Sequence, residues 1–297
     1  MLPAAETPLV RLGNLFPRRA VYAKCEFLAP SGCFKIRGAN HLLDHLSRKG
    51  QVRPLIVPSM GNTALGAATA AQAFGVAMTG VVPQTIARAK DEKLRALGVE
   101  LVKIAGGGSD LLRRATELAQ ERGGYFVHPH LDALWTDGYQ SIAAEVLRAL
   151  PGCRSLVFPV GGGGLLLGLL AHLRKQPAPV RLFGCEPYNY PKYAQFDHAR
   201  SATVADGLLL ETPHPAVQRA IAEAGVSIAL VSEEDIRAAL RDLYQTQGLV
   251  VEPSSAITLG FIQSHAADLE EPICAVLTGA NVTAEDHRRL MAAAPAV

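Results

Sequence analysis

The 297-residue sequence lacks an excess of either charge, a paired cysteine motif and a long apolar run. Its formal net charge is +2 with acids and bases mixed along the chain, so it has no basic stripe of the kind that nucleic-acid-binding proteins use. The five cysteines are scattered without a Cys-x-x-Cys pair, which favours buried thiols in a reducing compartment over disulfides or a metal site. They are Cys25, Cys33, Cys153, Cys185 and Cys274.

Targeting and membrane-spanning segments are also missing from the pattern. No basic region precedes the early apolar stretch, which Pro3 and Pro8 interrupt, so we expect no signal peptide. The apolar run from Leu165 to Leu170 is far too short to cross a bilayer. With 49% hydrophobic residues the chain can bury a core, and its composition excludes disorder, collagen-like repeats and a coiled coil. We expect a soluble, cytoplasmic protein.

Short apolar runs alternate with amphipathic stretches, which is typical of a parallel sheet covered by helices. The first series predicts strands at 55–57, 76–82, 100–104 and 125–127, with helices at 64–74, 87–97 and 110–121. The second series predicts helices at 141–150 and 165–174, with strands at 155–159, 180–185 and 273–277. We therefore predict an α/β protein of two lobes, each a mostly parallel twisted sheet flanked by helices. The predicted domains are residues 1–52 with 132–297, the larger, and residues 53–131, the smaller.

Lys35 lies in a turn rich in Pro and Gly, beside Phe34 and just before a helix that begins near Arg37. A lysine shielded from water has a lowered pKa and can be neutral enough to form an imine. The segment by itself favours an ordinary surface lysine next to a core aromatic, because most lysines lie at the surface.

Four consecutive glycines, Gly161, Gly162, Gly163 and Gly164, precede Leu165 between a strand and an apolar helix. Such a run lets the backbone curl around an anion, and the helix N-terminus adds partial positive charge, which suits a phosphate. The spacing fails the dinucleotide-binding pattern because positions 166 and 167 are leucine, and the Gly-Lys-Ser/Thr ending of a P-loop is absent. A tight turn is the structural alternative.

Two further segments follow predicted strands. Ser59, Met60, Gly61, Asn62 and Thr63 stand at a helix N-terminus, where hydroxyl and amide groups can hold a carboxylate or merely cap the helix. Thr278 places a hydroxyl at the carboxyl end of the last strand, where ligands bind in α/β folds, although a strand-ending turn is equally compatible.

In this order, the four segments resemble the fold type II pyridoxal-phosphate enzymes, which include tryptophan synthase β-subunits, cysteine synthases, threonine synthases and serine/threonine dehydratases. The resemblance runs from the Thr7-Pro8-Leu9 segment to Thr278. It is nearest to the serine/threonine dehydratase and serine racemase group, through the motifs Phe34-Lys35-Ile36-Arg37-Gly38-Ala39, Ala205-Asp206-Gly207, Glu252-Pro253-Ser254-Ser255-Ala256, Thr278-Gly279-Ala280-Asn281 and Gly138-Tyr139-Gln140-Ser141.

The resemblance implies that pyridoxal 5'-phosphate lies in a cleft between the large cofactor-binding domain and a small mobile domain. Lys35 would carry it as a Schiff base and, once freed, would shuttle the Cα proton. The other cofactor contacts would be Phe34 on the ring, Asn62 on its 3′-oxygen, Gly161 to Gly164 and the amide of Leu165 on the phosphate, and Thr278 at the pyridine nitrogen.

The substrate carboxylate would be taken by Ser59 with the loop Met60, Gly61, Asn62 and Thr63. A hydroxyl rather than a carboxylate at Thr278 limits electron withdrawal into the ring and favours elimination over transamination.

Three positions depart from the family pattern. Met60 replaces the second serine of the racemases and cannot carry a proton, which disfavours two-base racemisation. Thr63 replaces the usual histidine of dehydratases and is closer to cysteine and threonine synthases. Lys192 follows Glu186 by six residues, where metal-dependent members have an acidic group, so we expect its ammonium in the place of a cation and predict no divalent metal.

The resemblance therefore predicts an ammonia-lyase that eliminates the β-substituent of serine, threonine or a 3-hydroxylated relative and releases a 2-oxo acid and ammonia. The alternatives are β-replacement, favoured by Thr63, and a non-catalytic protein that binds the cofactor. Because Val297 follows soon after Thr278, we expect no regulatory C-terminal domain, and we expect a homodimer acting on a small amino acid.

Overall fold

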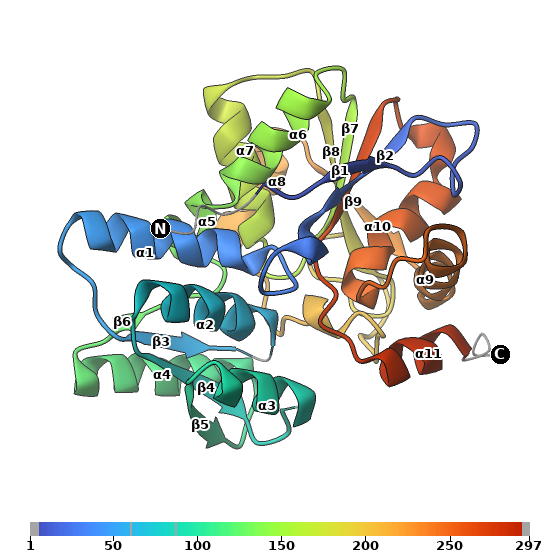
Figure 1. Cartoon of the computed structure of the whole chain (residues 1–297). Helices are drawn as coiled ribbons and strands as arrows, with labels where there is room; N and C mark the ends of the chain where they lie inside the picture. Colours follow the sequence, from blue (N-terminus) through green and yellow to red (C-terminus); the bar gives the residue numbers. More distant parts are fainter. Residues whose placement is uncertain (1–5, 60, 87, 293–297) are drawn as a thin grey trace. The chain divides into compact units, whose positions relative to one another are not determined.

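The computed structural model describes residues 6–59, 61–86 and 88–292, which form two compact units (Figure 1). Unit 1 comprises residues 29–141, and unit 2 comprises residues 6–28 together with the described residues from 142 onward. The predicted small domain, residues 53–131, lies inside unit 1, which also contains the helices on either side of that segment. Its movement as a separate domain stays a prediction.

Unit 1 contains a four-stranded parallel sheet in the order β5-β4-β3-β6. The strands are β3 (Leu55–Pro58), β4 (Met78–Pro83), β5 (Glu100–Ile104) and β6 (Tyr125–Phe126). The helices are α1 (Lys35–Arg48), α2 (Asn62–Phe74), α3 (Arg88–Ala96), α4 (Gly108–Arg122) and α5 (Ala133–Asp137). The strand order reverses after β5, so right-handed crossovers place α2 and α4 on opposite faces of the sheet, as Figure 1 shows.

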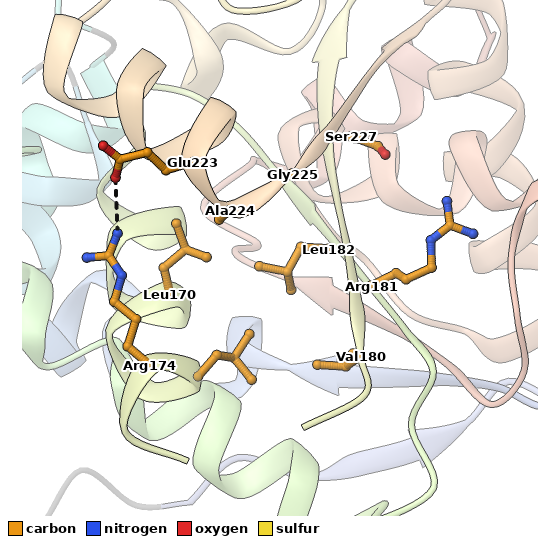
Figure 2. A pocket seen from close by; sticks show the side chains of 10 residues that line it. Leu170, Arg174, Val180, Arg181, Leu182, Glu223, Ala224, Gly225 and Ser227 are labelled. Carbon is orange, nitrogen blue, oxygen red and sulfur yellow. Dashed lines mark ion pairs between the residues drawn. The ribbon is translucent and has the colours of Figure 1, made fainter. Parts of the chain in front are cut away.

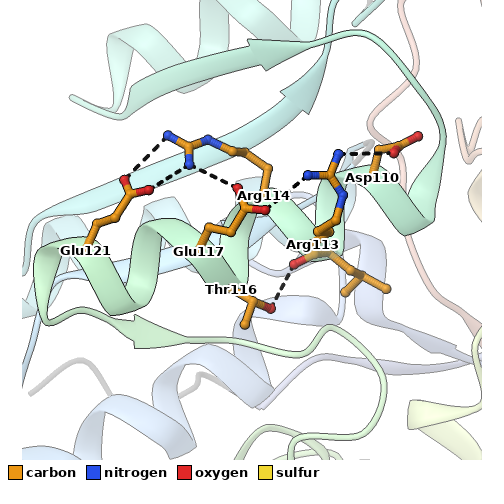
Figure 3. Close-up of polar contacts among 7 residues, drawn as sticks. Asp110, Arg113, Arg114, Thr116, Glu117 and Glu121 are labelled. Carbon is orange, nitrogen blue, oxygen red and sulfur yellow. Dashed lines mark hydrogen bonds and ion pairs between the residues drawn. The ribbon is translucent and has the colours of Figure 1, made fainter.

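The two faces of α4 illustrate why this segment is helical. Its inner face buries Leu111, Ala115 and Leu118 in the core of unit 1, against Ile56 and Val81 of the sheet. Its outer face carries a row of ion pairs at helical spacing, shown in Figure 3, in which Arg113 and Arg114 contact Asp110, Glu117 and Glu121. Solvent screens exposed pairs of this kind, so they add little stability and the buried face dominates.

Unit 2 contains a six-stranded sheet in the order β1-β2-β10-β7-β8-β9, in which only β1 is antiparallel to its neighbour. The strands are β1 (Leu9–Arg11), β2 (Val21–Cys25), β7 (Ser155–Pro159), β8 (Arg181–Pro187), β9 (Ser227–Val231) and β10 (Ile273–Leu277). The helices are α6 (Gln140–Ala149, which starts at the end of unit 1), α7 (Gly164–Lys175), α8 (Pro215–Ala224), α9 (Glu233–Gln247), α10 (Pro253–Ser264) and α11 (Ala284–Ala292), with 3-10 turns at Glu26–Leu28, Asp206–Leu208 and Ala266–Asp268. None of the described helices combines the length and the hydropathy needed to span a bilayer.

The core of unit 2 surrounds α10. This helix packs on β7, β8, β9 and β10 and also against α9, so its residues from Pro253 to Ile262 are all buried. Because it is apolar on every side, it lacks the amphipathic period that marks a surface helix, which explains why the sequence analysis did not find it. Strands β1, β2 and β9 and helices α5, α8, α9 and α11 were not predicted either. The five cysteines are buried thiols.

Candidate functional site

Lys35 is the first residue of α1. Its Nζ lies 4.8 Å from the ring centroid of Phe34 and 5.8 Å from that of Tyr139. Burial lowers the pKa of Lys35 from 10.5 to about 8, and the nearby Cys33 opposes the shift. Roughly one such amine in ten is therefore neutral at pH 7, and the neutral form is the one that attacks an aldehyde.

The ring of Tyr139 is held in place by Trp135. Both side chains are fully buried, and Trp135 Nε1 donates a hydrogen bond of 2.5 Å to the Tyr139 hydroxyl. Phe34 and Tyr139 have ring centroids 4.8 Å apart, so the three aromatics form one group beside Lys35. Burial raises the pKa of Tyr139 well above its usual value, and the phenol stays neutral. In the sequence Tyr139 stands only within the Gly138-Tyr139-Gln140-Ser141 motif, from which its contact with Lys35 was not predicted.

Gly66 of α2 faces the backbone of Lys35. A Cβ at Gly66 would lie 2.7 Å from Lys35 Cβ and 2.8 Å from the amide nitrogen of Ile36. Only glycine allows α1 and α2 to approach so closely at the reactive lysine. A glycine inside an alanine-rich helix is the sequence signal that could have revealed this close approach.

Ser59 follows β3 and caps α2. Its Oγ accepts hydrogen bonds from the amides of Gly61 (3.0 Å) and Ala64 (3.1 Å), and the side chain is buried. Since the oxygen accepts two bonds, the hydroxyl proton is the part of Ser59 that can be given to a ligand. Met60 lies outside the described residues.

The loop after Ser59 lies next to the Lys35 segment and next to a second lysine. Cys33 Sγ is 3.6 Å from the carbonyl oxygen of Asn62, and Thr63 is buried. A Cβ at Gly61 would lie 3.0 Å from Nζ of Lys90, a residue of α3 that the sequence analysis did not consider. A cation beside a helix N-terminus adds to the positive potential there, so the start of α2 favours an anion.

In unit 2 the glycine run joins β7 to α7. Gly163 has φ +86°, and a Cβ there would lie 2.4 Å from Val217 of α8, so both backbone conformation and packing require glycine. Gly161 differs, because the nearest atom to a Cβ at this position is 3.5 Å away. A Cβ at Gly161 would therefore make only ordinary van der Waals contacts, with Gly207 and Leu208, and the run leads directly into the N-terminus of a 12-residue helix, whose partial positive charge favours an anion.

Thr278 follows β10, the strand that pairs in parallel with β7. Since Ile273 lies opposite Ser155, Thr278 and the glycine run leave the same edge of adjacent strands. Chain order reverses between these strands, which is the point where open α/β sheets bind ligands. Thr278 Oγ1 is 3.1 Å from Ser255 Oγ, and the amide of Gly279 donates to Ser255 Oγ at 2.7 Å.

These contacts leave Thr278 as a buried, uncharged hydroxyl whose orientation depends on Ser255 of α10. The next serine, Ser254, accepts from the amide of Gly207 at 3.1 Å, and a Cβ at Gly207 would lie 2.7 Å from Ser254 Oγ. The Ala205-Asp206-Gly207 and Glu252-Pro253-Ser254-Ser255-Ala256 motifs thus meet in unit 2.

A hollow of about 550 Å³ lies elsewhere in unit 2 (Figure 2). It is lined by Leu170 and Arg174 of α7, the start of β8 near Leu182, and Glu223 at the end of α8. Val180 and Ser227 place it at the amino ends of β8 and β9, whereas the glycine run follows a carboxyl end. It contains none of the predicted site residues.

Taken unit by unit, these residues have the chemistry that pyridoxal phosphate would require. Unit 1 supplies a desolvated amine between aromatic rings and an anion-favouring helix start, and unit 2 supplies a glycine-rich helix start and a neutral buried hydroxyl at the neighbouring strand end. These are the groups that an aldehyde, a carboxylate, a phosphate and a ring nitrogen would each require.

A family model described as pyridoxal-phosphate dependent enzyme matches residues 1–279. The chain belongs to this family, and pyridoxal phosphate is its cofactor.

Within this family, the chain is similar to threonine dehydratases. An L-threonine ammonia-lyase from Geobacter sulfurreducens is 32% identical over 270 residues, covering 88% of this chain and 67% of the relative. A catabolic L-threonine dehydratase from Staphylococcus aureus is 29% identical over 290 residues, covering 93% and 84%. The structure of processed threonine deaminase isoform 2 from Solanum lycopersicum aligns with a TM-score of 0.87 at 26% identity, covering 97% and 82%.

These findings confirm the predicted fold type II family, the α/β fold, the cofactor and the lyase class. The chain is a pyridoxal-phosphate-dependent lyase of the dehydratase type.

Proposed function

We propose that this enzyme is an ammonia-lyase that removes the β-hydroxyl of serine, threonine or another 3-hydroxy amino acid, yielding a 2-oxo acid and ammonia. The observation that carries the proposal is the Lys35 amine, buried beside Phe34 and Tyr139 with a pKa near 8. Threonine dehydratases among the relatives support the substrate class.

Lys35 has two tasks in this proposal. Its neutral amine would hold the cofactor, and the same amine, when free, would take the proton from Cα of the substrate. An amine of pKa near 8 suits both tasks, since it is a better base than water and is still partly neutral at pH 7. The bound cofactor supplies the electron sink that makes the Cα proton acidic.

The remaining residues bind and orient. Ser59 donates its hydroxyl proton to the substrate carboxylate at the start of α2, where Asn62 and Thr63 follow and Lys90 adds positive charge. Gly161 to Gly164 and the amide of Leu165, at the start of α7, would hold the phosphate. The Thr278 hydroxyl, oriented by Ser255, would be the group at the ring nitrogen, and an uncharged hydroxyl there would leave that nitrogen largely neutral, which favours elimination.

A β-replacement reaction is the second candidate. Thr63, buried at the start of α2, is the residue that supports it, because dehydratases usually carry histidine there. The two reactions share every step up to loss of the β-substituent and differ in whether a second nucleophile is then required.

The test is a screen of the purified holoenzyme against L-serine, L-threonine and other 3-hydroxy amino acids, with ammonia and 2-oxo acid measured together. Lyase activity predicts equal amounts of both from substrate alone. Products that form only after a thiol or amine is added would assign β-replacement. A cofactor absorbance band that no amino acid shifts would instead indicate a non-catalytic binding protein.

We also propose a homodimer in the cytoplasm, on the family resemblance alone. Light scattering on the purified holoenzyme tests the dimer, and a mass of one chain would contradict it.

A further inference from the structure

Unit 2 contains a fully buried ion pair that the reaction does not use. Lys192 Nζ lies 3.4 Å from Glu186 Oε1, and both side chains are 0% exposed. Lys192 Nζ also donates to the carbonyl oxygen of Tyr190 at 3.3 Å. Burial lowers the pKa of Lys192, while the Glu186 carboxylate raises it in opposition.

The other oxygen of Glu186 organises the chain after β8. Oε2 accepts hydrogen bonds from the amides of Lys192 (2.9 Å), Tyr193 (3.0 Å) and Ala194 (3.1 Å). Three successive amides on one carboxylate fix a loop that has no regular secondary structure of its own. A buried pair contributes little net stability, so its retention points to a role in setting conformation.

This loop connects to the glycine run through α8. The Tyr193 hydroxyl accepts from the amide of His214, the residue just before α8. Val217, in the first turn of α8, is the side chain that packs against Gly163. From the other side, the amide of Val160 donates to Cys185 at 2.9 Å, so the glycine run also starts next to the end of β8.

We propose that Lys192 is a built-in cation that holds the loop after β8 in the form that supports the glycine run, so that phosphate binding needs no divalent metal. A carboxylate with a main-chain carbonyl is the oxygen set that a hard divalent cation takes. Here these oxygens face an ammonium that is part of the chain, and Arg200, which donates to the carbonyl of Pro191, adds a second positive charge nearby. The residues therefore do not fit a divalent cation.

The inference rests on the proposed use of Gly161–Gly164 as the phosphate anchor. Its test is the dissociation constant for pyridoxal phosphate, measured without substrate from the absorbance of the bound cofactor, together with the melting temperature. Lys192→Met removes the charge at nearly constant volume, and we expect binding to weaken about tenfold or more and the melting temperature to fall. The matched control is Lys175→Met, an exposed lysine at the end of α7, for which both values stay unchanged.

Two further variants test the proposal if Lys192→Met folds poorly. Lys192→Ala leaves space beside Glu186, so ethylammonium chloride should restore cofactor affinity and melting temperature, whereas sodium chloride at equal ionic strength should not. Tyr193→Phe leaves the ion pair intact and removes the bond to His214, and it should weaken cofactor binding with little loss of melting temperature.

The opposite results are equally clear. The proposal is overturned if Lys192→Met binds the cofactor with unchanged affinity. It is also overturned if magnesium raises the cofactor affinity or the stability of the natural enzyme and a chelator reverses that gain. If both salts restore the cofactor affinity of Lys192→Ala equally, or if neither does, Lys192 is not needed there as a cation. If Tyr193→Phe binds the cofactor as tightly as the natural enzyme, the loop does not act through α8. Gly161→Val tests the phosphate site independently of Lys192. If this variant binds the cofactor as tightly as the natural enzyme, the assignment of Gly161–Gly164 as the phosphate site is wrong.

Discussion

Attachment of pyridoxal phosphate to Lys35 should follow the pH dependence of an amine whose pKa is about 8. Only the neutral amine attacks the aldehyde. With a pKa of about 8, roughly one lysine in ten is neutral at pH 7, against roughly one in 3,000 for the ordinary value of 10.5. Burial therefore raises the rate of attachment at pH 7 by roughly 300-fold over that of an exposed lysine of equal nucleophilicity.

The assay mixes the apo-protein with pyridoxal phosphate between pH 6 and pH 10 and follows the absorbance of the attached cofactor. A blocked lysine amide in the same buffers corrects for the titration of the cofactor itself. The ratio of the protein rate constant to that of the model amine should stay constant below about pH 8 and fall roughly tenfold per pH unit between about pH 8 and pH 10, because only the model amine continues to gain neutral form there. A protein rate constant that continues to rise in parallel with the model amine up to pH 10 would refute the assigned environment of Lys35.

The same shift has a consequence for stability. The folded-state pKa is lower than that of the unfolded chain, so the unfolded chain binds more protons between about pH 8 and 10.5 and apo-protein stability rises with pH in that range. Below about pH 8 the full penalty, about 3 kcal/mol, is present. Denaturant unfolding of apo Lys35→Met should show this penalty removed at pH 7, with a smaller difference at pH 10; a variant less stable than the natural apo-protein at both values contradicts the shift.

Three substitutions test other parts of the site. Ser59→Ala removes the cap of α2 and one hydrogen-bond donor to the substrate. The melting temperature should therefore fall by the equivalent of about 1 kcal/mol, and KM should rise roughly fivefold with less change in kcat. A change in kcat alone would assign Ser59 another role. Ser255→Ala releases Thr278 and should shift the absorbance maximum of the bound cofactor, and an unshifted spectrum argues against the contact to the ring nitrogen. Gly66→Val pushes α2 away from Lys35 and should abolish cofactor attachment, while Gly75→Ala at the end of the same helix should keep it; attachment in Gly66→Val disproves the close approach.

Local pattern was sufficient for the parts of the fold that alternate regularly. The strands Glu100–Ile104, Ser155–Pro159 and Ile273–Leu277 were predicted with their observed bounds, because each is a short apolar run bounded by turn residues. The four glycines are turn residues, and they correctly predicted the start of α7. Helix α10 escaped prediction because it is buried on every side and shows no amphipathic period.

Contacts between distant segments could not be read from the sequence. Spacing does not reveal that Trp135 holds the ring of Tyr139 beside Lys35, or that Lys90 lies beside Gly61, since these depend on how helices pack. The pairing of Lys192 with Glu186 was suggested by a six-residue interval, but its burial and its link to α8 follow only from tertiary structure.

The most direct test of the central claim is to reduce the holoenzyme with borohydride, which makes the link between lysine and cofactor permanent, and to locate the modified residue by peptide mass spectrometry. The account predicts one pyridoxyl phosphate per chain on Lys35, and none in Lys35→Ala, which should also release no ammonia from L-serine or L-threonine. Modification of another lysine in the active natural enzyme, or activity in Lys35→Ala, would contradict it.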